Sequence, residues 1–328
     1  MPDHHTPASN QATTPPGHNT TPPDHATVPP SHATTPPGHD TILVTGATGT
    51  TGSRLIPRLL ALGHQVRAAG RRGPEPPGTR PVAFDWHDPA THDAALRGAA
   101  RLYLVPPTAA PDPAAVMLPF LARARTAGVH RVVLLSSSAI PAGGPGVGQV
   151  HAALPGLFDE WVVLRPSWFM QNFTGSHPHA EALRTHGTLM TATGTGRVGF
   201  IDADDIAAVA AHALTAPPLP DHDLVLTGPE ALSYDDIAAT LTTVTGRPAR
   251  HHPVTPAQLR DHLASTMPTE FATLLADLDH ALAHGAGAHL TPTVEHLTGH
   301  PPRSFRTHAE RWWQGGRGRG TPKGTPAA

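Results

Sequence analysis

The sequence predicts an α/β fold in which a doubly wound parallel sheet is followed by a smaller, mainly helical C-terminal lobe. A short run of apolar and β-branched residues at 41–44 leads into a glycine-rich loop and then into a helical segment that stops at Gly63. A second apolar segment at 65–69 completes a strand–helix–strand unit, which joins two parallel strands. The same alternation continues to residue 226, as expected for a doubly wound sheet.

The other strands are predicted where short apolar runs recur, because a strand buried on both faces is apolar without alternation. They fall at 101–105, 131–135, 161–165 and 223–226, with one more strand just before Asp85, and the helices between them include 114–127 and 204–214. From residue 228 the chain changes to helical segments separated by Pro and Gly, at 234–245, 256–265 and 270–284. Pro57 lies inside the first helix, and we expect it to kink or shorten that helix.

Four segments follow from this pattern: a repeat tail at 1–39, an α/β domain at 40–227, a C-terminal lobe at 228–314 and a flexible tail at 315–328. In the first tail, Pro-Pro-x-His recurs on a seven-residue step. Paired prolines forbid helix and few apolar residues offset the ordering entropy, so we expect a disordered, partly polyproline II chain. Its histidines either bind a divalent metal weakly or belong to a solvated linker.

Composition limits the classes of function. With a formal charge of -2 and a pI of about 6.9, the chain lacks the basic excess of proteins that bind a phosphate backbone, so we expect no nucleic-acid partner. The absence of cysteine excludes disulfides, thiolate nucleophiles and cysteine-ligated zinc. No apolar run approaches the roughly 20 residues that span a bilayer, and no signal-peptide pattern is present. We therefore expect a cytoplasmic protein without a membrane partner.

The glycine-rich loop predicts a dinucleotide site, because it lies directly between the first strand and the first helix. Gly46 permits a tight turn, Gly49 lets the backbone approach a pyrophosphate, and Gly52 allows close helix packing. The unpaired amides at the helix start then bind the anion, with Thr48, Thr50 and Thr51 completing the loop. The domain is therefore predicted to be a Rossmann-type NAD(P)-binding domain, and the alternative is an ordinary glycine-rich turn.

Two arginines favour NADPH over NADH. Enzymes that prefer NAD usually carry an acidic residue after the second strand, where this chain has Gly70-Arg71-Arg72. Planar guanidinium groups match the geometry of a 2'-phosphate. The alternative is a solvated turn. Asp85 and Trp86, after the third strand, are candidates to flank the adenine.

The pair of residues with which short-chain dehydrogenases protonate their substrate, Tyr-x-x-x-Lys, is absent. The only tyrosines are Tyr103 and Tyr234, each followed four residues later by Pro107 or Ala238, and the sole lysine is Lys323. Either the protein performs no chemistry, or it delivers hydride to an acceptor that needs little help from a protein acid. An iminium ion already carries its positive charge, and a quinone gives weakly basic oxygens, so both qualify.

The ordered motifs of residues 41–310 resemble one known family. They include Val44-Thr45-Gly46-Ala47-Thr48-Gly49, Phe84-Asp85-Trp86-His87-Asp88, Leu104-Val105-Pro106-Pro107, Leu134-Leu135-Ser136-Ser137-Ser138 and Leu164-Arg165-Pro166-Ser167-Trp168-Phe169-Met170-Gln171-Asn172-Phe173. This set resembles the NmrA-like atypical short-chain reductases, and within them the festuclavine and agroclavine dehydrogenase-like branch of ergot alkaloid biosynthesis. The resemblance implies an NADPH-dependent reductase of cyclic iminium intermediates. The repeat tail, Pro57 and Gly70 depart from the family pattern.

Position in the expected sheet gives the remaining site residues. Val105 and Pro106 end the fourth strand beside the expected nicotinamide, and Ser136 and Ser137 end the fifth. His151 lies near the lysine position of relatives that have the full pair, so it is a candidate to bind ribose or donate a proton. The candidates for substrate binding follow the sixth strand, where ligands bind in such sheets, and are Trp168, Phe169, Met170, Asn172 and Phe173. The alternatives are strand-end structure for the serines, surface for His151 and core packing for the aromatic segment.

The leading hypothesis is an NADPH-dependent reductase of an imine or iminium-type small molecule in specialised metabolism. A quinone or enone reductase is the second hypothesis, and an NADP(H)-sensing regulator without turnover is the third. His280 and His284, one helical turn apart, show no third metal ligand, so no metal site is predicted. The oligomeric state is left open.

Overall fold

The computed structural model describes residues 40–71, 76–107, 110, 112–219 and 222–317. The repeat tail at 1–39, Arg72, and residues 318–328 of the C-terminal tail lie outside the described residues. None of the helices within these ranges combines the length and the apolar character needed to cross a membrane.

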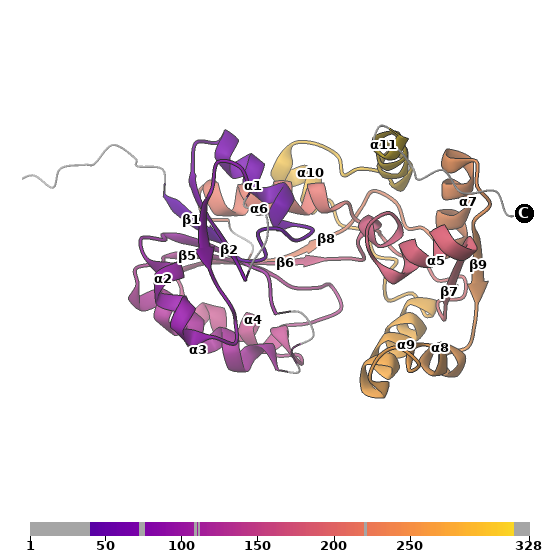
Figure 1. The fold of residues 1–328 in the computed structure, drawn as a ribbon, viewed down its shortest axis with the longest axis horizontal. Coiled ribbons are helices and arrows are strands. Elements are labelled where there is room, and N and C mark those ends of the chain that lie inside the picture. Colours follow the sequence, from indigo (N-terminus) through magenta and orange to yellow (C-terminus); the bar gives the residue numbers. More distant parts are fainter. Residues whose placement is uncertain (1–39, 72–75, 108–109, 111, 220–221, 318–328) are drawn as a thin grey trace, which may run out of the picture. The chain divides into compact units, whose positions relative to one another are not determined.

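Seven parallel strands form the main sheet, in the order β3-β2-β1-β4-β5-β6-β8 (Figure 1). Their bounds are β1 Thr41–Val44, β2 Gln65–Gly70, β3 Arg80–Ala83, β4 Arg101–Leu104, β5 Arg131–Leu135, β6 Glu160–Pro166 and β8 Asp223–Leu226. The order reverses direction between β1 and β4, which confirms the doubly wound topology predicted from the sequence. Ligands bind outside the carboxyl ends of the strands at such a reversal.

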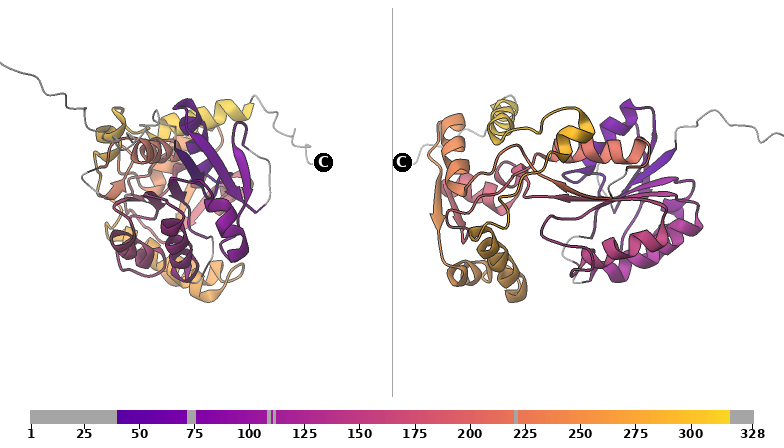
Figure 2. Two further views of the ribbon diagram at one scale, coloured as in Figure 1. Left: turned by 90° about the vertical axis from the view of Figure 1, so that its left-hand side faces the viewer. Right: turned by 180° about the vertical axis from the view of Figure 1, so that it is seen from behind.

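Helices cover both faces of this sheet (Figure 1), and the view from behind in Figure 2 shows the same two layers. One layer consists of α1 Gly52–Ala61, α6 Ala203–Thr215 and α10 Thr293–Thr298, and the other of α2 His92–Leu96, α3 Pro113–Thr126 and α4 Val147–Leu157. The side chains of the central strands pack against both helix layers. In β1, Ile42 and Val44 belong to the core cluster under α1 and α6, whereas Leu43 belongs to the cluster on the opposite face. This double burial explains the unbroken apolar run of the sequence.

A second, two-stranded sheet was not predicted. It pairs β7, Thr188–Thr191, in parallel with β9, Arg250–Pro253. The helices α5 Pro178–His186, α7 Tyr234–Thr245, α8 Pro256–Leu263, α9 Thr269–Ala283 and α11 Phe305–Arg317 complete this lobe, with the short 3-10 helix η2 Met170–Phe173. Because β7 lies within the range expected for the dinucleotide-binding domain, a boundary at residue 227 does not separate the lobe from the main sheet.

Pro57 does not shorten the first helix. Helix α1 continues through Pro57 to Ala61, and the proline ring lies on the exposed side while Leu55, Ile56 and Leu59 face the core. An exposed proline costs one intrahelical hydrogen bond without disturbing the packed face.

Candidate active site

A cleft of about 900 Å³ lies at the carboxyl ends of the strands. It is lined by Gly46, Ala47, Thr48, Gly49, Thr50, Thr51, Ala68, Ala69, Gly70, Arg71, Pro76, Pro81, Val82, Ala83, Phe84, Asp85, Trp86, His87, Val105, Pro106, Pro107, Leu135 and Phe169. The part lined by the residues that follow β2 and β3 is called the β2–β3 end below. The part lined by Val105, Pro106, Pro107, Leu135 and Phe169 is called the β4–β6 end.

The glycine loop has the close backbone contacts expected of a phosphate-binding turn. Gly46 adopts a left-handed conformation with φ of +61°, and a β carbon there would lie 3.0 Å from Cβ of Val105. The Gly49 amide donates to the carbonyl oxygen of Gly46 at 2.9 Å and closes the turn. A β carbon on Gly52 would collide with that same carbonyl group, so α1 starts directly against the turn. Larger side chains at these positions would displace the loop.

The start of α1 fits an anion. Thr51 is the N-cap residue and its side chain makes no capping hydrogen bond. The amides of Thr50, Thr51 and Gly52 donate to no acceptor among the described residues. Unpaired amides at a helix start suit a negatively charged group such as a pyrophosphate. The residues present therefore fit a dinucleotide.

Val105, directly after β4, is held by hydrogen bonds to two neighbours. Its amide donates to Oγ1 of Thr45 at 2.7 Å, and its carbonyl oxygen accepts from Nε1 of Trp86 at 3.2 Å. Trp86 is largely buried and packs edge-on against Phe84 and Phe120. It therefore forms part of the cleft wall. The role of Thr45 was missed, because a buried threonine in a strand-end motif gives no separate signal.

Arg71 is exposed at the β2–β3 end, where the sequence predicts it to bind a 2'-phosphate. It also lines an adjoining hollow of about 580 Å³ with Asp85, Asp88 and Thr91. Oδ1 of Asp85 accepts a hydrogen bond from the amide of His87 at 2.9 Å, which fixes the turn after β3.

The two serines after β5 lie beside the cleft and do not line it. Oγ of Ser136 is buried and has no hydrogen-bond partner among the described residues. Oγ of Ser137 accepts a hydrogen bond from the amide of Ala139 at 3.3 Å. This local contact at the end of a strand is the structural alternative predicted for the serines. Leu135, which precedes them, contributes the side chain that reaches the cleft.

His151 is not brought to the cleft by the structure. It lies on α4, is 3% exposed, and packs with its ring centroid 6.0 Å from that of Trp161, at the start of β6. Burial lowers the pKa of the imidazole, with a smaller raising effect from Asp223 and a lowering one from Arg165. His151 is therefore a core histidine, and the surface alternative named for it is wrong.

The aromatic segment after β6 divides between the cleft and the core. Phe169 lines the cleft, whereas Met170 and Phe173 are buried in the lobe, where Phe173 packs edge-on against Phe200, Tyr234 and Phe305. Trp168 and Asn172 are half-buried and do not line the cleft. The core-packing alternative therefore holds for Met170 and Phe173.

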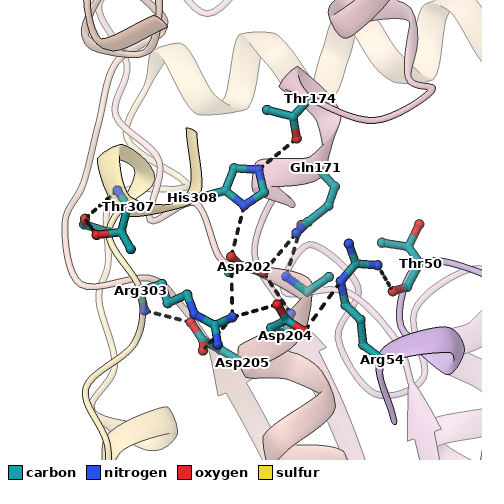
Figure 3. A network of polar contacts seen from close by, with 12 residues as sticks. Thr50, Arg54, Gln171, Thr174, Asp202, Asp204, Asp205, Arg303, Thr307 and His308 are labelled. Atoms are coloured by element: carbon teal, nitrogen blue, oxygen red, sulfur yellow. Dashed lines mark hydrogen bonds and ion pairs between the residues drawn. The ribbon is translucent and has the colours of Figure 1, made fainter. Parts of the chain in front are cut away.

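A network of polar side chains outside the cleft was not predicted (Figure 3). The carboxylate of Asp202, the N-cap of α6, accepts from Nδ1 of His308 at 3.0 Å and from Nε2 of Gln171 at 2.9 Å. Nε2 of His308 lies 2.8 Å from Oγ1 of Thr174. Burial alone would raise the pKa of Asp202, but the hydrogen bonds from His308, the Asp204 amide and Gln171 outweigh it and hold the pKa well below its usual range.

Comparison with known proteins agrees with this geometry. A family described as NAD(P)H-binding matches residues 46–154. The chain is 41% identical over 276 residues to the uncharacterised oxidoreductase YesF of Bacillus subtilis, covering 83% of this chain and 96% of that one. It is 39% identical to an agroclavine dehydrogenase of Claviceps fusiformis, covering 81% and 94%. The fold matches an NADPH-dependent quinone oxidoreductase from Escherichia coli solved with NADPH, with a TM-score of 0.68 at 23% identity, covering 82% and 99%.

The fold, the glycine-rich turn and these relatives define an NAD(P)H-dependent oxidoreductase. Its relatives place it more narrowly. The chain belongs to the NmrA-like atypical short-chain dehydrogenase/reductase family and is related to the clavine dehydrogenases.

Proposed function

We propose that the protein is an NADPH-dependent reductase that transfers hydride to an imine or iminium-type small molecule in specialised metabolism. One observation carries the proposal. None of the described residues that line the β4–β6 end, where the nicotinamide is expected, has an ionisable side chain. An acceptor reduced there would receive no proton from any of these described lining residues. An iminium ion needs none, because hydride addition gives a neutral amine directly.

The tyrosines do not supply the missing acid. Tyr103 and Tyr234 are both fully buried in core clusters, and burial raises the pKa of each phenol above its ordinary value. Neither side chain lines the cleft. Lys323 lies outside the described residues.

The chain's own residues would bind and orient the reactants. A bound reduced nicotinamide supplies the hydride. The amides of the glycine loop would hold the pyrophosphate and Arg71 the 2'-phosphate, and Val105 and Pro106 would support the reactive ring. The face of Phe169 would attract a planar cation, since aromatic faces carry negative charge density. The agroclavine and festuclavine names of the relatives agree with a nitrogen heterocycle as the substrate class.

A quinone or enone reductase is the second candidate, favoured by the same apolar surface at the β4–β6 end. A reduced quinone has weakly basic oxygens that water can protonate. The difference between the two candidates is charge, because an iminium ion is a cation and a quinone is neutral.

The test follows NADPH oxidation by the purified protein with cyclic iminium ions, a para-quinone and a cyclic enone. We expect turnover with the iminium ions. The Phe169→Leu variant should raise KM for them about 3- to 30-fold, as expected for loss of a cation–π contact, and change the KM for a quinone less. Leu62→Ala, a substitution at the exposed C-cap residue of α1, is the control. Turnover with quinone alone would replace the first candidate by the second, and tight NADPH binding without turnover on any acceptor would favour a regulator.

A further inference from the structure

A chain of charged side chains connects the glycine loop to the C-terminal segment (Figure 3). Arg54, in the first turn of α1, donates from Nη1 to the carbonyl oxygen of Thr50 at 2.6 Å. Its Nε lies 3.7 Å from Oδ1 of Asp204. The other carboxylate oxygen, Oδ2 of Asp204, lies 2.9 Å from Nη1 of Arg303. The loop that lines the cleft is therefore contacted by a guanidinium group that is itself held from α6.

The contact at Thr50 fixes the direction of a neighbouring amide. The backbone amide of Arg54 donates to the carbonyl oxygen of Thr51 and not to that of Thr50. The Thr50 carbonyl oxygen accepts from the Arg54 side chain instead. In a trans peptide the carbonyl and the following N–H point to opposite sides. Holding the Thr50 oxygen against Arg54 therefore turns the Thr51 amide the other way. Thr51 lines the cleft, and its amide has no acceptor among the described residues.

Asp204 is itself well placed to hold Arg54. The backbone amide of Asp204 donates to Oδ1 of Asp202 at 2.9 Å, and this capping contact fixes Asp204 in the first turn of α6. Arg303 is anchored by a second contact, since its backbone amide donates to Oδ2 of Asp205 at 2.8 Å. The side chains of Arg54 and Asp204 are 33% and 37% exposed, so their ion pair contributes little to stability, and its effect is on orientation.

We propose that Arg54, held by Asp204 and Arg303, is a positioning residue that turns the Thr50–Thr51 peptide so that the Thr51 amide faces the pyrophosphate of the dinucleotide. This inference rests on the proposed use of a nicotinamide dinucleotide. It assigns to the C-terminal segment a part in cofactor binding, although Arg303 does not line the cleft.

The test compares the dissociation constants of NADPH, NADH and adenosine 2'-monophosphate by calorimetry. Arg54→Met should weaken both dinucleotides about tenfold, the loss expected for one charge-assisted hydrogen bond. It should leave adenosine 2'-monophosphate unchanged, because that probe has no pyrophosphate. Asp204→Asn should weaken both dinucleotides about threefold, and Arg54→Lys should recover part of the loss. The melting temperature of each variant reports whether it folds.

Arg58→Met is the matched control. Arg58 also contacts Asp204, with Nη2 3.8 Å from Oδ1 and a hydrogen bond to the carbonyl oxygen, but among the described residues it has no polar contact with the loop. We expect its dissociation constants to equal those of the wild type. An equal loss in this control would mean a general charge effect, and wild-type affinity in Asp204→Asn would mean that Arg54 acts alone; either result overturns the inference. Wild-type protein that binds neither dinucleotide would overturn the proposed cofactor, and the inference with it.

Discussion

The carbonyl group of Gly46 lies so close to the α carbon of Gly52 that no β carbon fits between them. This contact joins the turn after β1 to the first residue of α1. It sets the distance between the unpaired amides of the loop and the end of the sheet, and so it determines where a pyrophosphate would lie.

Gly52→Ala should therefore displace the loop. We expect NADPH binding to weaken at least tenfold and the free energy of unfolding to fall by about 1 to 3 kcal/mol, as for other overpacked sites. Calorimetry and thermal melting measure the two effects. The control is Gly156→Ala in α4, where a β carbon meets nothing within 4 Å. Unchanged NADPH affinity in Gly52→Ala would contradict this account of the turn.

Arg71→Gln should change cofactor preference. Loss of a guanidinium beside a 2'-phosphate is expected to raise the dissociation constant of NADPH about 10- to 100-fold and to leave that of NADH nearly unchanged. Fluorescence titration with each dinucleotide measures the ratio. Arg125→Gln, at an exposed position on α3, controls for net charge. Equal losses for NADPH and NADH would show that Arg71 does not read the 2'-phosphate.

Asp202→Asn should make the protein less stable and less sensitive to acid. The pKa of Asp202 is depressed in the folded state, so its stabilising effect is complete above the unfolded value of about 3.9 and is lost as the pH falls further. We expect the variant to lose about 1 to 3 kcal/mol at pH 7, because the buried carboxylate that accepts hydrogen bonds from His308 and Gln171 is replaced by a neutral amide. Denaturant unfolding at pH 7 and pH 3 tests this. The same acid sensitivity in both proteins would contradict it.

Asp279→Asn should have the opposite effect. Burial raises the pKa of Asp279 to about 6, partly offset by the hydrogen bond from the Ala192 amide at 2.8 Å. A raised carboxyl pKa contributes stability that is present below the unfolded value and is lost as the pH rises through about 6. The asparagine can still accept from Ala192, so we expect the variant to melt higher than the wild type at pH 8 and nearly equal to it at pH 4. A difference independent of pH would rule out ionisation of Asp279 as the cause.

Elements with a local signal were predicted well. Strands β5 and β8 agree with the sequence prediction to the residue, because each is an unbroken apolar run after one charged residue. The glycine loop was equally clear, since its spacing and its place between strand and helix are both visible in the sequence. Strand β9 was missed because its residues, Arg-His-His-Pro, are polar or β-breaking and are paired only by β7.

Features that depend on packing between distant segments could not be predicted. Asp202 and His308 are 106 residues apart, and nothing local marks either as a partner of the other. The same limit explains the segment after β6. Its position at the end of a strand suggested a binding surface, but the direction of Met170 and Phe173 is set by the lobe that closes over them.

Strands β7 and β9 come from chain segments on opposite sides of residue 227, so this lobe cannot be exchanged between relatives as one continuous segment. A fragment ending at residue 227 would keep β7 without its partner strand and would expose Phe173 and Phe200, whose covering residues come from α7 and α11. Unpaired strand edges next to bare apolar side chains favour aggregation. Chimaeras built to alter substrate range therefore need two crossover points, one on each side of the strand pair.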